Sequence, residues 1–241
     1  MRIDVLGVGF DDFTIESAAL LAYKKIQNAE QTYVVTPNPE IVWLSRKDEK
    51  LRTVLCNAGL VLADGIGIVI GAKILGTALK GGRVPGIDFI TALFDKLASS
   101  GGRVFLLGSK PGVAQTAGEK LFEKHKGLII AGTADGYFND SAALIEKINA
   151  SSPDLLLVCL GAPKQEFWMA ENLAKLNVPL CAGLGGSLDV FAGNVKRAPV
   201  FFQRFGLEWL YRIIKEPRRL KRSLSLPLFL FRIIFKKITG R

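Results

Sequence analysis

The sequence predicts an α/β fold: a Rossmann-like, mostly parallel β-sheet with helices on both faces, plus a basic C-terminal helical appendage. About seven apolar runs typical of buried strands alternate with segments whose apolar residues recur at helical spacing. Five of the turns that follow the strands are polar or glycine-rich, whereas the opposite turns carry little chemistry. Because parallel strands end at one edge of a sheet, these turns predict a single site along that edge.

The charge separates a nearly neutral body from a basic tail. The chain has 241 residues, 49% of them hydrophobic, which is enough for one large domain with an appendage. Residues 204–241 contain eleven Lys and Arg against two Glu, a net charge of +9, so residues 1–203 carry +1 of the total +10. We therefore predict a Rossmann-like catalytic domain over 1–203 and an amphipathic, membrane-associating appendage over 204–241.

Several classes of protein are disfavoured by the composition. The sequence shows neither a leader-type segment nor an apolar run of the roughly 18 to 20 residues that a membrane-spanning helix needs. Cys56, Cys159 and Cys181 are too few for a disulfide scaffold, and we interpret them as reduced core thiols of a cytoplasmic protein. The only histidine, His125, lies in a charged stretch, which argues against a zinc site or a histidine-dependent triad. We predict no metal and no cofactor.

The first strand is expected at 3–8 and a helix at 13–26. Gly7-Val8-Gly9 resembles the start of a dinucleotide-binding GxGxxG turn, but Asp12 stands where the third glycine belongs. An acidic side chain there is also poorly suited to a pyrophosphate. A plain strand-to-helix turn is the favoured interpretation.

The next two strands, at 32–35 and 59–63, each end in polar residues. Asp64 is a lone acid at the carboxyl end of a buried strand, and we hypothesise that it is a general base. Thr36 and Asn38 lie in a proline-rich turn. That turn fits a simple strand-to-helix connection with Asn38 as the cap, or a site role in which the Thr36 hydroxyl projects at the same edge as Asp64.

The middle of the chain adds three candidates. Arg83 follows two glycines, which suggests a mobile loop carrying a cation or, more plainly, a solvated arginine. Gly108 and Ser109 follow a strand at 103–107, before a helix whose free amide groups could hold a phosphate or a ribose. Tyr137, after a strand at 127–132, fits either stacking on a base or ordinary packing.

The last two strands, at 154–160 and 178–182, are followed by glycines and polar residues. These residues are Gly161, Gln165, Glu166, Gly185, Gly186 and Asp189. The Gln-Glu pair fits helix capping or hydrogen bonding to uracil or ribose. The glycines allow close approach of the backbone to a ligand, and the aspartate fits a cap or an acceptor for a base or ribose.

The basic tail has apolar residues between its charges. This pattern suits an amphipathic segment in the headgroup layer of an anionic membrane. Nucleic acid is the rival partner, but no nucleic-acid-binding motif is evident and we predict none is bound. Some of the arginines could instead fold back over a diphosphate.

Seven motifs together resemble one family over nearly the whole chain. They are TPNPE (36–40), ADGIGIV (63–69), RVPGID (83–88), GSKPGV (108–113), GAPKQE (161–166), GLGGSLD (183–189) and RAP…GLEWLYR…EPRR (197–219). The sequence is similar to the WecG/TagA/CpsF glycosyltransferases, and most similar to the members that act in wall teichoic acid synthesis. Each motif is weak alone, but the ordered set is specific.

The resemblance implies an inverting, metal-independent transfer of N-acetylmannosamine from UDP-ManNAc to undecaprenyl-diphosphate-GlcNAc, with a β-1,4 bond. The enzyme would lie peripherally on the inner face of the bacterial cell membrane. Asp64 would be the base, and arginines would offset the charge of the departing UDP. The alternatives are another UDP-sugar donor (ManNAc uronic acid or glucose), a nucleotide-dependent oxidoreductase, and a non-catalytic adaptor. The oligomeric state is left open, a homo-oligomer included.

These arguments define the predicted site. We predict catalytic roles for Asp64, Thr36, Arg83 and Gln165. We predict substrate binding for Asn38, Gly108, Ser109, Tyr137, Gly161, Glu166, Gly185, Gly186, Asp189, Arg212, Arg219 and Arg222.

Overall fold

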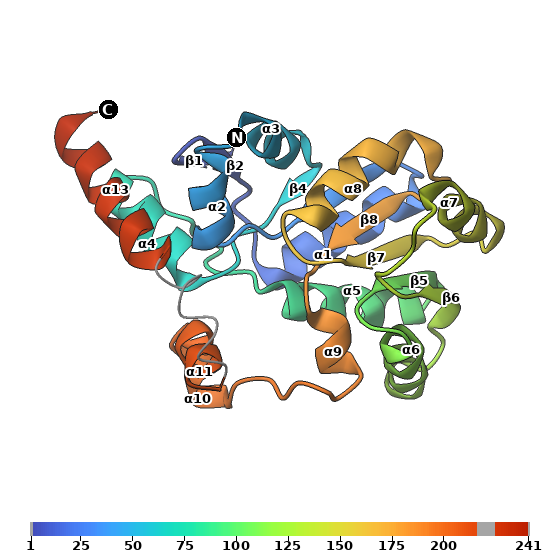
Figure 1. Ribbon diagram of the computed structural model, residues 1–241. Helices are drawn as coiled ribbons and strands as arrows, with labels where there is room; N and C mark the ends of the chain where they lie inside the picture. Colours follow the sequence, from blue (N-terminus) through green and yellow to red (C-terminus); the bar gives the residue numbers. More distant parts are fainter. Residues whose placement is uncertain (1, 216–224, 241) are drawn as a thin grey trace.

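A six-stranded parallel sheet forms the centre of the molecule, with the strand order β4-β3-β8-β7-β5-β6 (Figure 1). The computed structural model describes residues 2–215 and 225–240. The strands are β3 (Thr32–Val35), β4 (Leu60–Val61), β5 (Arg103–Gly108), β6 (Ile129–Ala134), β7 (Leu155–Cys159) and β8 (Leu180–Gly183). The predicted α/β class is confirmed.

Helices cover both faces of this sheet. One face carries α2 (Pro39–Ser45), α3 (Glu49–Asn57), α7 (Ser141–Ala150), α8 (Lys164–Asn172) and the short η1 (Leu173–Lys175). The other carries α1 (Ile15–Gln27), α5 (Gly86–Ala98), α6 (Val113–Lys124) and α9 (Ser187–Phe191). Alternation along β5 explains both layers: Phe105 and Leu107 pack on the first face, Val104 and Leu106 on the second, and all four are fully buried.

The prediction for residues 3–8 is wrong. Strands β1 (Ile3–Val5) and β2 (Val8–Phe10) form a separate antiparallel hairpin, in which Val5 pairs with Val8. Leu6 and Gly7 both have positive φ, 55° and 90°, as a two-residue hairpin turn requires. Gly7-Val8-Gly9 is therefore neither a strand-to-helix turn nor a dinucleotide loop. The hairpin is joined to β4 by Asp11, whose carboxylate accepts from Val61 N at 2.8 Å.

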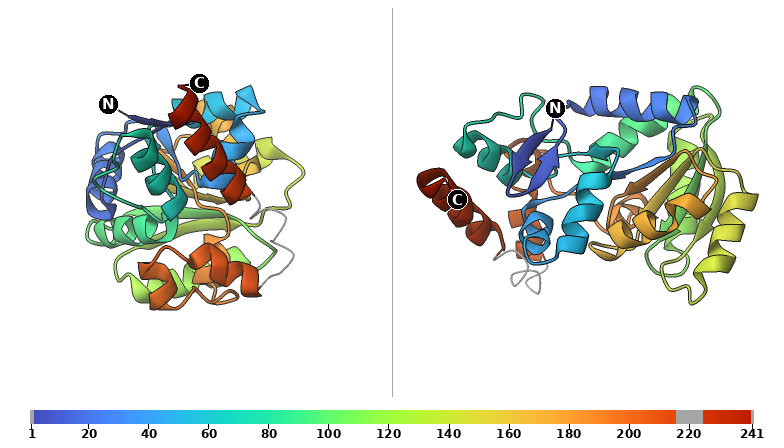
Figure 2. Two further views of the ribbon diagram at one scale, coloured as in Figure 1. Left: turned by 90° about the vertical axis from the view of Figure 1, so that its left-hand side faces the viewer. Right: turned by 90° about the horizontal axis from the view of Figure 1, so that it is seen from above.

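The described residues after 199 include three helices, one of which packs against the body. These are α10 (Val200–Arg204), α11 (Glu208–Lys215) and α13 (Ser225–Thr239). Helix α13 packs on α2 and on α4 (Ile66–Leu75), at the end of the molecule that carries the hairpin (Figures 1 and 2). Its Phe229 and Ile233 are fully buried, and Gly71 of α4 makes room for the Phe229 ring, which would lie 3.2 Å from an added Cβ.

The boundary predicted between 203 and 204 falls inside α10. Residues of α13 share the core on the α2 face with the sheet, so the described part of the tail is partly built into the body. Within residues 2–215 and 225–240, no helix combines the length and the hydropathy needed to cross a bilayer.

Candidate active site

The predicted site residues other than the four arginines follow the carboxyl ends of all six parallel strands and therefore lie along one edge of the sheet. The order across that edge runs from Asp64 after β4, through Thr36 after β3 and the glycines after β8, to Tyr137 after β6. With about 4.8 Å between neighbouring strands, β4 and β6 are roughly 24 Å apart. Asp64 and Tyr137 thus mark opposite ends of a long row.

Asp64 lies against the turn that follows β3. Its backbone N donates to Pro37 O at 3.3 Å, and the preceding Ala63 O accepts from Val84 N at 2.8 Å. Gly65 adopts φ 99°, and a Cβ there would lie 3.5 Å from the ring of Pro39. The Asp64 turn is therefore flanked by the proline-rich turn on one side and by the Arg83 loop on the other. The Asp64 side chain is partly exposed.

Thr36 and Asn38 have different surroundings. The Thr36 side chain is buried, and its hydroxyl donates to Gly183 O at 3.4 Å, which ties the end of β3 to the end of β8. Asn38 is the N-cap of α2, and its Oδ1 accepts from Ile41 N at 3.0 Å. The capping interpretation is thus confirmed for the Asn38 oxygen, and both residues border the Asp64 turn.

Gln165 and Glu166 form a buried polar pair beside the β8 exit. Gln165 accepts from Gly185 N at 2.8 Å and donates to Glu166 Oε1 at 2.9 Å. Gly183 leaves space for this arrangement, because an added Cβ would lie 2.6 Å from Met169 and 3.1 Å from the Gln165 amide nitrogen. Gln165 therefore sets the path of the Gly185-Gly186 loop.

Glu166 is an acid in an apolar setting. It is 1% exposed, and its Oε2 has no hydrogen-bond partner among the described residues. Burial raises the pKa of Glu166 above its ordinary value, and the hydrogen bond from Gln165 opposes that rise only in part. Burial therefore shifts the protonation equilibrium of Glu166 toward the neutral acid, relative to a glutamate in water.

The crevice between β5 and β7 is a topological switch point. The chain leaves β5 toward β6 and leaves β7 toward β8, in opposite directions. Ser109 Oγ donates to Asp189 Oδ2 at 2.8 Å, and Ser109 N donates to Cys159 O at 3.2 Å. Gly108 has no room for a side chain, because a Cβ would lie 2.2 Å from Cys159 O. This crevice also includes the Gly161 turn, and open α/β sheets place ligands at such points.

Tyr137 lies beyond that crevice. Its ring is 67% exposed and borders a cavity of about 330 Å³ whose other lining residues include Gly112, Asp135 and Lys147. The cavity lies at the β6 exit and does not include Asp64. The two candidates can therefore serve only distant parts of one extended ligand.

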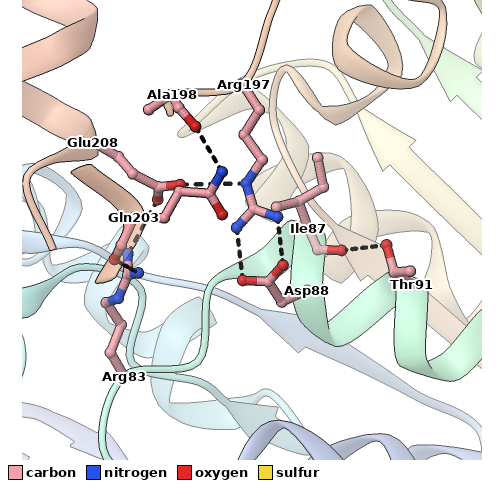
Figure 3. Close-up of polar contacts among 8 residues, drawn as sticks. All are labelled: Arg83, Ile87, Asp88, Thr91, Arg197, Ala198, Gln203 and Glu208. Carbon is pink, nitrogen blue, oxygen red and sulfur yellow. Dashed lines mark hydrogen bonds and ion pairs between the residues drawn. The ribbon is translucent and has the colours of Figure 1, made fainter. Parts of the chain in front are cut away.

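The Arg83 side chain is largely buried and paired, not solvated. It is 16% exposed, pairs with Glu208 at 3.0 Å and donates to Gln203 O at 2.6 Å. The Arg197 guanidinium donates two hydrogen bonds to the Asp88 carboxylate, of 2.5 and 2.7 Å, and one to Glu208 at 3.3 Å (Figure 3). Burial alone would lower the pKa of Arg197, but the Asp88 and Glu208 carboxylates outweigh it and raise that pKa.

This ion-pair cluster was not predicted from the sequence. Arg197 and Glu208 belong to quoted motifs, but nothing local links them to Arg83 and Asp88, which lie more than a hundred residues earlier in the chain. Among the tail arginines, Arg212 lies in α11, whereas Arg219 and Arg222 lie outside the described residues.

The remaining titratable groups fit structural roles. Cys159 and Cys181 are buried, and burial raises the pKa of each thiol to about 12. Cys56 is exposed on α3, so its assignment to the core is wrong. His125 is 4% exposed, with Nδ1 2.7 Å from Asp95 Oδ1. Within the described ranges, no three His, Cys, Asp or Glu side chains are grouped so that they could hold a metal ion.

Comparison with known proteins gives matches over most of the chain. A family model described as "Glycosyl transferase WecG/TagA/CpsF family" matches residues 3–241. A relative from Bacillus spizizenii, named N-acetylglucosaminyldiphosphoundecaprenol N-acetyl-beta-D-mannosaminyltransferase, is 41% identical over 202 residues, which cover 84% of this chain and 78% of that enzyme. A Staphylococcus aureus (strain MW2) protein of the same name is 31% identical over 235 residues, 96% of this chain and 92% of that enzyme.

Proposed function

The chain belongs to the WecG/TagA/CpsF glycosyltransferase family, and from this premise we propose that it transfers N-acetylmannosamine from UDP-ManNAc to undecaprenyl-diphosphate-GlcNAc. The product carries a β-1,4 bond and belongs to the linkage unit of wall teichoic acid. The observation that carries the proposal is the match to relatives of this name over most of both chains, 96% of this chain and 92% of the relative in one case.

The chemistry proposed for Asp64 is general base catalysis. As the acceptor hydroxyl oxygen attacks the anomeric carbon, its proton passes to the Asp64 carboxylate and the bond between that carbon and the UDP oxygen breaks. A single base suffices for one inverting displacement. The position of Asp64 at the end of β4, between the Thr36 turn and the Arg83 loop, supports this role.

The departing UDP carries growing negative charge, which we assign to arginines. Arg83 lies in the loop whose Val84 N is bonded to Ala63 O, next to Asp64. Arg212, Arg219 and Arg222 are the further candidates for binding diphosphate. The nucleoside of the donor then extends along the row of strand ends toward Ser109 and Asp189 at the β5–β7 crevice.

The test of the activity is a direct transfer assay. The full-length protein is incubated with UDP-ManNAc and a lipid-diphosphate-GlcNAc analogue, and the release of UDP is measured with and without the acceptor. Acceptor-dependent release supports the proposal. Parallel reactions with the UDP-linked uronic acid and with UDP-glucose test the alternative donors, and a higher kcat/KM with either would replace the assigned donor.

The oxidoreductase alternative has lost its main support. The Gly7-Val8-Gly9 segment belongs to a two-stranded hairpin and does not open a helix after a strand of the parallel sheet, as a dinucleotide-binding turn must. A titration with NAD that shows saturable binding would restore this alternative.

We also propose that the C-terminal appendage, predicted over 204–241, holds the catalytic body at an anionic membrane surface. The flanking helix α10 and the described part of the appendage expose large apolar side chains beside basic ones. The exposed apolar residues are Val200, Phe201, Phe205, Ile214, Leu228, Phe231, Ile234, Phe235 and Ile238. Arg204, Lys215, Lys236 and Lys237 lie on the same three helices. Apolar anchors combined with positive charge favour binding in the headgroup layer.

A vesicle sedimentation experiment tests this attachment. The protein is expected to sediment with vesicles that contain anionic lipid, less with neutral vesicles, and less as salt is added, because basic side chains contribute about 1 kcal/mol each near such a surface. Equal binding to neutral vesicles would remove the electrostatic part of the proposal. Binding to RNA of similar strength would favour the nucleic-acid alternative.

A further inference from the structure

We propose that Glu208 is a positioning residue for the transfer reaction: it orients Arg83 toward a substrate diphosphate from the far side of the guanidinium. This inference rests on the proposed function and extends it to a residue to which neither the motifs nor the comparisons assign a role. The ligand chemistry is a diphosphate, which both the nucleotide donor and the lipid-linked acceptor carry.

The first observation is that one carboxylate serves two arginines. Glu208 is 15% exposed in its side chain, with Oε2 3.0 Å from Arg83 Nη1 and Oε1 3.3 Å from Arg197 Nε. Arg197 is in turn held by Asp88 in the first turn of α5. The cluster pairs two positive with two negative groups, so each charge is compensated where it is largely removed from water. Glu208 is consequently fixed from two directions (Figure 3).

The second observation is the place of Arg83 relative to Asp64. Val84 N donates to Ala63 O at 2.8 Å, so the residues that directly precede Asp64 and follow Arg83 are bonded to each other. Arg83 Nη2 also donates to Gln203 O, whose residue is anchored by its own amide to Ala198 O at 2.6 Å. The Arg83 side chain is thus clamped between the body and the segment 197–208.

A clamped guanidinium can still bind an anion. Arginine has five N–H donors in a rigid fork, and the contacts to Glu208 and Gln203 use one donor on each terminal nitrogen. The other donors keep a fixed direction because the fork is planar. A diphosphate that meets them does not have to order the side chain itself, which favours the transition state in which the leaving group becomes charged.

The same contacts connect the membrane-facing helices to the catalytic edge. Gln203 belongs to α10 and Glu208 to α11. Phe201 and Ile214 of these helices are exposed, as is Phe205 in the turn between them. Contact of these helices with lipid would therefore stabilise the segment that holds Arg83. Glu208 is the ionic link in that connection.

The experiment compares wild type, Glu208→Gln and Glu208→Asp in the full-length protein, with Glu171→Gln as the matched control. Glu171 also pairs with a cation, Lys50, but both side chains are more than half exposed and lie on α8 and α3. We expect Glu208→Gln to lower kcat/KM about 10- to 100-fold, by analogy with the loss of other residues that orient a site group. Glu208→Asp is expected to retain part of the kcat/KM that Glu208→Gln loses, and Glu171→Gln is expected to have the kcat/KM of wild type.

A double-mutant cycle separates positioning from a general structural effect. If Glu208 acts through Arg83, adding Glu208→Gln to an Arg83→Ala variant changes kcat/KM by less than about twofold. If Glu208 only supports the fold, the two losses multiply, and the inference is wrong. Separate KM values for UDP-sugar and for the acceptor analogue identify which diphosphate Arg83 contacts.

Binding of UDP, measured by calorimetry, keeps the two proposals distinguishable. Wild type that binds UDP and turns over, with Glu208→Gln unchanged in both properties, overturns the positioning role and leaves the transferase intact. Wild type that neither binds UDP nor releases it from UDP-ManNAc overturns both. We expect wild type to turn over and Glu208→Gln to bind UDP or the acceptor more weakly. We also expect the effects of the two substitutions in the cycle to be non-additive.

Discussion

The sheet body and the C-terminal helices bury their apolar residues to very different extents. All five residues of β7 are buried, whereas α13 buries Phe229 and Ile233 but leaves Phe231 70% and Ile238 78% exposed. Most of the apolar side chains of the body are buried in its two core layers. The C-terminal helices have one face packed on the body and another that nothing in the described residues covers. This difference is consistent with the proposed contact between the second region and an external apolar surface.

The two regions also differ in charge and in how they are joined. The body is nearly neutral and the tail carries +9. They meet through an apolar contact at Phe229 and an ionic cluster at Glu208. The catalytic candidates Asp64, Thr36, Gln165 and Arg83 belong to the body. Arg212, Arg219 and Arg222, the further candidates for binding a diphosphate, come from the tail. On the proposed function, the body carries out bond making, and the tail contributes most of the positive charge and the membrane attachment.

The largest expected effect tests whether the chemistry belongs to the body. Asp64→Asn should lower kcat by about 10²- to 10⁴-fold, because an amide cannot accept the acceptor proton. UDP affinity and vesicle binding should stay at the wild-type level, since neither needs the base. Steady-state kinetics and calorimetry measure both, with Glu171→Gln as the control for loss of a carboxylate. Activity above a tenth of wild type would show that the base lies elsewhere.

The second effect contrasts two phenylalanines on one helix. Phe229→Ala should lower the free energy of unfolding by about 3–5 kcal/mol, because it empties a fully buried position against Gly71. Phe231→Ala should change it by less than about 0.5 kcal/mol, since that ring is exposed. Urea denaturation measures both.

The exposed Phe231 also tests whether the C-terminal helices, unlike the body, contact a membrane. Phe231→Ala should weaken binding to anionic vesicles about tenfold, the effect of losing one apolar anchor of roughly 1.5 kcal/mol. If Phe231→Ala sediments with vesicles as well as wild type does, the exposed face of α13 is not a membrane contact.

The third effect concerns the switch point in the body. Gly108→Ala should destabilise the fold by about 3 kcal/mol, because φ is 133° and the new Cβ would lie 2.2 Å from Cys159 O. Gly101→Ala is the matched control: it also has positive φ, 67°, but meets nothing within 4 Å. Its cost should be about 1–2 kcal/mol. Equal melting temperatures for the two variants would contradict the close approach of β5 to β7.

The smallest effect is a pH dependence within the body. Because burial raises the pKa of Glu166, the stability due to its neutral form is present at low pH and is lost as pH rises through the raised pKa. Glu166→Gln keeps an acceptor for the Gln165 amide and never ionises. The melting temperature of Glu166→Gln should therefore increase relative to that of wild type as the pH rises above 4.5, the ordinary pKa of a glutamate. A difference between the variants that does not change with pH would contradict the prediction.

Most of the secondary structure could be predicted from local spacing, and the exceptions are informative. The strands after residue 30 and the helices that follow them lie close to their predicted positions, since apolar residues at periods of 2 and 3.6 indicate which face is buried. The hairpin of Ile3–Val5 and Val8–Phe10 was misread as one strand. Its apolar residues do alternate, but alternation does not reveal which strand is the partner or where the chain reverses.

The candidate site could be predicted as a list of residues but not as an arrangement. Polar turns after strands predict Asp64, Gln165 and Asp189 as candidates. The capping of α2 by Asn38 was predicted as one of two roles and is confirmed. The ion pair between Arg83 and Glu208 was not predicted, because 125 positions separate the two residues. A charged residue in a glycine-containing loop is also normally solvated.

Local sequence was thus sufficient for the α/β class, the polar strand exits and the division of charge between body and tail. These features depend on residues within a few positions of one another, or on simple counts. Only the packed chain determines the strand order and the distance between Asp64 and Tyr137. It also determines that Glu208 pairs with Arg83 and that Phe229, rather than Phe231, is buried. These arrangements follow from contacts between residues far apart in sequence, which form only when the helices and the sheet close around a common core.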